Sequence, residues 1–93
     1  MSVYMVSYDI PEGNPSYQKI VDCLGNKLNA ERVLESQWLL VHDGDSEIIF
    51  KTLELEMQKD DRVFVQMVTG DFHGKNTMLS EAELLEYIAE ASL

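Results

Sequence analysis

The chain opens with MSVYMVSYDI, residues 1–10, and this stretch decides the fold. Successive side chains of a strand point to opposite faces of its sheet, and both alternating sets over residues 3–10 are mostly apolar. A strand that is apolar on both faces is typical of the centre of a sheet covered on both sides. The strand ends on a carboxylate, Asp9, and the turn residues 11–15 follow directly. Asp9 is therefore the first candidate functional residue.

Helix and strand patterns alternate after this first strand. Asn14 and Pro15 suit the cap and the first position of a helix, which Gly25 is expected to end. Residues 32–41 are rich in branched and aromatic side chains and predict strand. Their polar middle, residues 35–37, fits a bend, a bulge or a tight turn between two short strands.

The second half of the chain repeats the alternation. We expect a helix over residues 47–58 and a strand over residues 62–69. A loop follows, with a short edge strand at residues 77–79. Ser80 and Glu83 have the spacing of a capping box, so a last helix is expected from this point to the C-terminus.

This order of elements predicts an α+β fold in a single domain, residues 1–93. The expected architecture is ferredoxin-like (split βαβ): an antiparallel sheet with helices on one face, plus a C-terminal helix. The core would span about residues 3–70, with the edge strand and last helix in residues 71–93. The other sheet face would be bare, so we expect a second copy to cover it in a homodimer.

The composition limits the classes of function. Seventeen acidic residues against seven basic ones give a net charge of −10. The basic residues stand singly along the chain: Lys19, Lys27, Arg32, Lys51, Lys59, Arg62 and Lys75. No basic stripe of the kind that binds duplex nucleic acid is present in the sequence. The acidic surface favours solubility, repulsion of nucleic acid, or docking on a basic protein partner.

Other sequence features indicate the compartment. The single cysteine, Cys23, excludes an internal disulfide, fits a buried packing role, and is expected of a cytoplasmic protein. No apolar run approaches the ~20 residues that cross a membrane. The N-terminus lacks the basic region and cleavage site of a signal peptide, so we expect no membrane association.

Asp9 has two interpretations. A carboxylate at the end of a buried strand is costly unless it is paired, hydrogen-bonded or bound to a metal. It can cap the Pro11 turn, or it can be a hard ligand for Mg²⁺ or Mn²⁺. One carboxylate is a poor metal site, but two Asp9 residues meeting across a dimer axis could hold one ion that activates water against a phosphodiester.

Other polar residues are weaker candidates. His73, two residues after Asp71, suits a general base or a plain surface histidine. His42 is weaker still, and neither histidine has metal-ligand spacing. Ser36 has no nucleophile elbow around it. Trp38 is expected in the core or a dimer contact rather than as a base-stacking platform.

Three short stretches carry a resemblance to a known superfamily. Residues 4–10 resemble the first strand of the CRISPR-associated small adaptation subunit and of the virulence-associated protein D toxins. Residues 36–41 and 61–65 look closest to the SinR-like branch. The resemblance implies a ferredoxin-like homodimer in which Asp9 holds the position of the proposed metal-binding nuclease residue, and Ser36 the position of the family's serine.

The chain also departs from this family. The adaptation subunits carry a basic first helix, whereas this one has only Lys19 and Lys27. Residues 33–35 stand where the family has an arginine and a glutamine. We therefore expect a metal-dependent nuclease acting on RNA or short single strands through paired Asp9, with Ser36 and His73 as further catalytic candidates. The alternatives are a non-enzymatic acidic interaction module, and a small-ligand binder at the dimer interface for which the sequence offers no motif.

Overall fold

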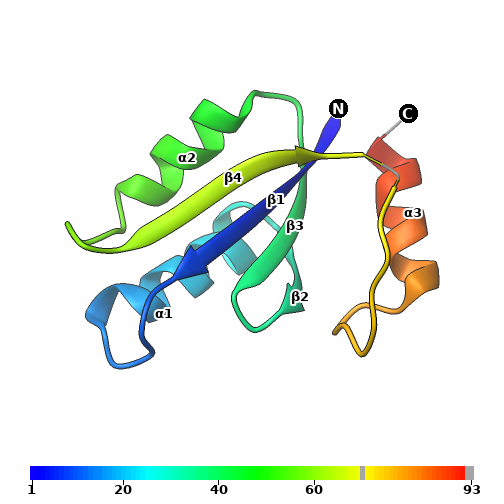
Figure 1. The fold of residues 1–93 in the computed structure, drawn as a ribbon. Helices are drawn as coiled ribbons and strands as arrows, with labels where there is room; N and C mark the ends of the chain where they lie inside the picture. Colours follow the sequence, from blue (N-terminus) through cyan, green and yellow to red (C-terminus); the bar gives the residue numbers. More distant parts are fainter. Residues whose placement is uncertain (70, 92–93) are drawn as a thin grey trace.

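The computed structural model describes residues 1–69 and 71–91. It is α+β, and the four strands form one antiparallel sheet in the order β2-β3-β1-β4 (Figure 1). The elements are β1 (Ser2–Asp9), α1 (Pro15–Asp22), a π-helical turn η1 (Cys23–Lys27), β2 (Glu31–Leu34), β3 (Gln37–His42), α2 (Ser46–Glu54), β4 (Arg62–Val68) and α3 (Glu81–Ala91).

The expected central strand is confirmed. β1 lies between β3 and β4 and pairs with both in antiparallel register, with Val6 opposite Trp38 on one side and Val65 on the other. The polar segment at residues 35–36 proves to be a tight turn between two short strands, one of the three alternatives that the sequence left open.

The main core lies between the sheet and the first two helices. Ile20, Leu24, Ile49 and Leu53 are completely buried against residues such as Val6 of β1. Each such side chain contributes about 1.5–3 kcal/mol when it leaves water. α1 and α2 therefore lie on the same side of the sheet, the first face, as the ribbon shows (Figure 1).

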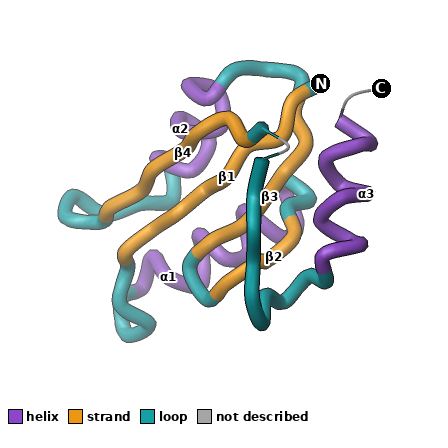
Figure 2. Tube along the Cα trace, turned by 45° about the vertical axis from the view of Figure 1, so that its right-hand side comes forward, coloured by secondary structure: helices purple, strands orange, loops and turns teal. Residues whose placement is uncertain are grey.

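The opposite side of the sheet, the second face, is not bare. α3 packs there through Leu84, which is 5% exposed, against Val3, Val33 and Leu39. Figure 2 shows α3 and the loop before it on the side of the sheet away from α1 and α2. This cover reaches Val68 at the end of β4 but not Phe64 nearer its start, which is 62% exposed. The expectation of a fully uncovered second face is therefore wrong.

Three local expectations are corrected. Gly25 does not end the first helix, because the N–H of Leu28 bonds to the carbonyl of Cys23 and continues it as a π-helical turn. α2 ends at Glu54 rather than at residue 58, since single turns follow it. Residues 77–79 form no strand; Met78 only donates its N–H to the carbonyl of Val33 in β2, over 2.8 Å.

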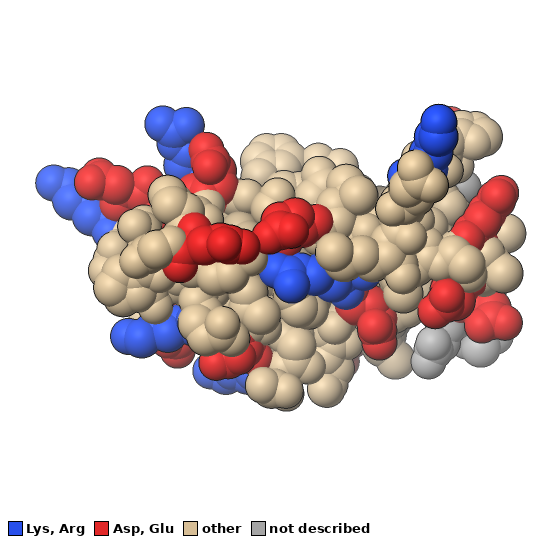
Figure 3. Space-filling view, turned by 90° about the horizontal axis from the view of Figure 1, so that it is seen from below, with Lys and Arg blue, Asp and Glu red and all other residues tan. Residues whose placement is uncertain are grey.

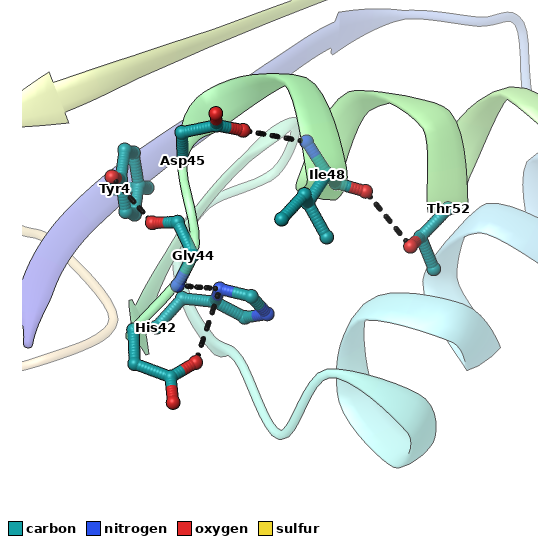
Figure 4. A network of polar contacts seen from close by, with 7 residues as sticks. Tyr4, His42, Gly44, Asp45, Ile48 and Thr52 are labelled. Atoms are coloured by element: carbon teal, nitrogen blue, oxygen red, sulfur yellow. Dashed lines mark hydrogen bonds and ion pairs between the residues drawn. The ribbon is translucent and has the colours of Figure 1, made fainter.

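The start of α2 is fixed by a turn network (Figure 4). Asp45 is the N-cap and its carboxylate accepts the N–H of Ile48 over 3.1 Å. The ring of His42 accepts the N–H of Gly44 through Nδ1 over 2.8 Å, and the hydroxyl of Tyr4 donates to the carbonyl of Gly44. His42 thus has a structural role in this turn.

Candidate functional site

Asp9 ends β1 on the second face, in the part that α3 leaves uncovered. It stands opposite Arg62 of β4, and Oδ2 of Asp9 lies 3.5 Å from Nη1 of Arg62. The side chains are 75% and 81% exposed respectively. Because the Asp9 carboxylate stays in contact with water, it has no desolvation cost that a bound metal or a capping bond would have to offset. An ion pair this exposed contributes little to stability and opens readily.

The donor set for a divalent cation is incomplete in one chain. Within the described ranges, no three His, Cys, Asp or Glu side chains gather where they could hold a metal ion. Mg²⁺ is commonly held by one or two carboxylates and several waters. In one copy the single Asp9 carboxylate is at the low end of this range and is paired with Arg62, whereas two Asp9 carboxylates facing each other would supply the fuller donor set.

The surroundings of Asp9 form a shallow hollow on the open part of the second face. Ser7, Asp9, Arg62 and Phe64 line it together with their strand neighbours. Ser7 lies opposite Phe64 in the β1–β4 register, so both project to this face beside the ion pair. The hollow thus combines a carboxylate, a guanidinium and an exposed aromatic ring.

The other two candidates lie in different places. The backbone carbonyl of Ser36 accepts the N–H of Tyr8 over 3.1 Å, which puts this turn beside the end of β1. His73 is exposed in the loop before α3 and lines a separate cavity that does not include Asp9. Within one chain the structure brings the backbone of Ser36 beside Tyr8, the residue before Asp9, but neither Ser36 nor His73 lines the Asp9 hollow.

A polar cluster under the β2–β3 turn was not predicted. Trp38 is 7% exposed, as expected of a core residue, and its indole N–H donates to the hydroxyl of Tyr8 over 3.1 Å. The guanidinium of Arg32 lies 5.0 Å from the Trp38 ring centroid and donates to the hydroxyl of Tyr17. Arg32 also donates to the carbonyl of Glu35. These contacts stabilise the β2–β3 turn, which contains Ser36.

Asp61 is the residue before Arg62 and lies just outside the hollow. The N–H of Gln58 donates to Oδ2 of Asp61 over 2.7 Å. Partial burial raises the pKa of the Asp61 carboxyl, but the Gln58 N–H and the nearby Ser16 and Asn14 side chains outweigh this, and the pKa falls below its ordinary value. Asn14 occupies the N-cap position of α1, yet its side chain makes no hydrogen bond to its own helix. These contacts place the start of α1 beside the start of β4.

The surface charge agrees with the sequence. On the side drawn in Figure 3, basic side chains lie apart from one another among acidic ones. No helix in the part of the chain that the structure describes has the length and apolar character needed to cross a membrane. Comparison with family models, curated proteins and solved structures gives no match to this chain.

Proposed function

We propose that two copies of this chain form a ferredoxin-like homodimer in the cytoplasm. The dimer would act as a Mg²⁺- or Mn²⁺-dependent nuclease on RNA or short single strands through its paired Asp9 residues. The ferredoxin-like assignment is supported by the strand order. β1 and β2 are joined by α1 with β3 between them, and β3 and β4 are joined by α2 with β1 between them. Two interleaved βαβ units of this kind define that fold.

One observation carries the proposed activity: an exposed carboxylate, an exposed guanidinium and an exposed phenyl ring meet at the open end of the second face. Phe64 gives a second copy an apolar surface to bury, and contact there would bring the two Asp9 side chains together. Arg62 presents the fork of donors that suits a phosphodiester. A divalent ion on the two carboxylates would supply an activated water and neutralise charge on the phosphate.

The charge of the chain sets the substrate class. With a net charge of −10, a long duplex is repelled along its whole length. A short single strand carries fewer phosphates, and it needs contact only at the hollow.

The deciding experiment is cleavage of end-labelled RNA and single-stranded DNA in Mg²⁺ or Mn²⁺ by the wild type and by Asp9→Ala, purified in parallel. We expect the wild type to cleave and Asp9→Ala to lose at least about 100-fold in rate, the range seen when a major charge-stabilising group is removed. Asp43→Ala is the matched control, because Asp43 is an exposed carboxylate beside α2. Equal cleavage by wild type and Asp9→Ala would exclude the proposal, as would no cleavage by either.

A second candidate is the non-enzymatic module that docks on a basic protein. The observation in its favour is α3, which carries Glu81 and Glu83 in its first turn and no base in its last. Glu83 also holds the capping box with Ser80, so its replacement would confuse docking with folding. The cleaner test is Glu86→Lys, which should release a basic partner retained by the wild type and by Glu31→Lys.

A further inference from the structure

An apolar cavity lies under the loop before α3, away from the Asp9 hollow. It has a volume of about 270 Å³ and is closed by the second face of the sheet below and by α3 at the side. Leu39, Val33, Phe72 and Leu84 are among the apolar side chains that line it. An apolar cavity of about 150 Å³ is enough to hold benzene, so this space admits a larger small molecule.

The polar side chains that line the cavity are Gln37, His73, Lys75 and Thr77. Gln37, His73 and Lys75 can donate hydrogen bonds to a ligand, whereas the Thr77 hydroxyl donates to the carbonyl of Leu79. The chain has seventeen acidic residues, yet none of the described residues that line the cavity is acidic. Glu81 belongs to a smaller adjoining hollow that shares His73 and Phe72. The cavity thus carries one cation, Lys75, and no acidic residue in its described lining, on a chain of net charge −10.

From this combination we propose that the cavity binds a small apolar monocarboxylate, with its hydrocarbon part against the sheet and α3 and its carboxylate at Lys75 and His73. The apolar walls favour a hydrocarbon chain or ring in the ligand, and the donors at the mouth favour an anionic head group. A neutral molecule of the same shape would leave the ammonium of Lys75 without its partner. A ligand with two or more negative charges would be repelled more strongly by the net negative charge of the chain.

The site is independent of the proposed nuclease. Its lining shares no residue with the hollow around Asp9, and it is complete within one copy of the chain. In this proposal His73 binds the carboxylate of the ligand, and it has no role in the Asp9 hollow, which it does not line.

The test is a titration followed by amide NMR, with octanoate as the anionic probe and 1-octanol as its neutral counterpart. We expect saturable shifts at amides of the cavity lining, such as those of Phe72 and Leu84, and tighter binding of octanoate than of octanol. Lys75→Gln should weaken octanoate about tenfold, the worth of one charge-assisted hydrogen bond, and leave octanol unchanged. Lys51→Gln is the matched control, since Lys51 lies exposed on α2 with Glu47 as its partner.

Each other outcome overturns the proposal. Equal affinity for both probes, or equal octanoate binding by wild type and Lys75→Gln, would mean that the mouth does not recognise a carboxylate. Absence of saturable shifts at the cavity up to about 10 mM, well above the millimolar limit of weak binding, would mean that the cavity holds no such ligand.

Discussion

Arg32 is the residue on which the β2–β3 turn most depends. Its guanidinium stacks on Trp38 and donates to the hydroxyls of Tyr8 and Tyr17 as well as to the Glu35 carbonyl. A lysine ammonium has neither the plane nor the fork of donors. We expect Arg32→Lys to lower the free energy of unfolding by about 1–2 kcal/mol, measured by urea denaturation.

Arg62→Lys is the comparison for this prediction. Arg62 is 81% exposed and is ion-paired with Asp9, so the same substitution there should change stability little. Similar losses at both positions would show that the cluster around Trp38 does not carry the stability assigned to it.

Asp61 makes the fold sensitive to acid. Its folded pKa lies below the ordinary value of 3.8, so its ionised form stabilises the fold at every pH above that value. The stabilisation is lost as the pH falls through the folded pKa. Asp61→Asn should therefore lower Tm near neutral pH, and its deficit against the wild type should shrink below about pH 4. Thermal unfolding from about pH 6 to about pH 2.5 measures this.

Asp60 provides the matched control, because it is the exposed neighbour of Asp61. Asp60→Asn should leave the whole profile close to that of the wild type. A deficit for Asp61→Asn that stays constant with pH would contradict the role given to its charge.

At the scale of elements, two caps control two helices independently. The Ser80 hydroxyl accepts the N–H of Glu83 at the start of α3, and Asp45 accepts the N–H of Ile48 at the start of α2. Loss of such a cap costs about 1 kcal/mol. We expect Ser80→Ala to reduce amide hydrogen-exchange protection in α3 and not in α2, and Asp45→Ala to do the reverse. Equal loss in both helices for either variant would mean that they unfold as one unit.

The sequence predicted the elements better than their ends. β1 was recognisable because both of its faces are apolar, and Ser80 and Glu83 form the expected capping box. The π-helical turn through Gly25 depends on backbone bonds such as that from Leu28 to Cys23, which no residue pattern in the sequence indicates. Asn14 was expected as a cap from its residue type, and it occupies the N-cap position, but its side chain makes no hydrogen bond to the helix.

The candidate site was predictable only in part, because its residues are brought together by contacts between distant parts of the chain. Asp9 stands out in the sequence because it ends an apolar strand. Its partner Arg62 is more than fifty residues away and is brought to it by sheet register alone. The cluster of Arg32 with Trp38 likewise depends on cross-strand pairing across a turn whose geometry the sequence left open.

At the scale of the whole molecule, the paired Asp9 site requires two copies of the chain to meet at the second face. α3 already covers part of the second face, so a second copy has only the open part around Phe64 to bury. We expect Phe64→Lys to shift sedimentation equilibrium to the monomer, because a charge replaces the apolar contact. Leu55→Lys is the control, since Leu55 is 78% exposed just after α2. A monomeric wild type at every concentration tested would contradict the paired Asp9 site.

The two edges of the sheet are unequal. Met78 donates its N–H to the carbonyl of Val33, so returning backbone already occupies part of the outer side of β2. Among the described residues no strand lies beyond β4, and its outer backbone groups can accept a strand from another molecule. A second copy that paired with β4 about a two-fold axis would fill both β4 edges at once. Strand addition at this edge would therefore be self-limiting: it would stop at two copies instead of growing into a fibre.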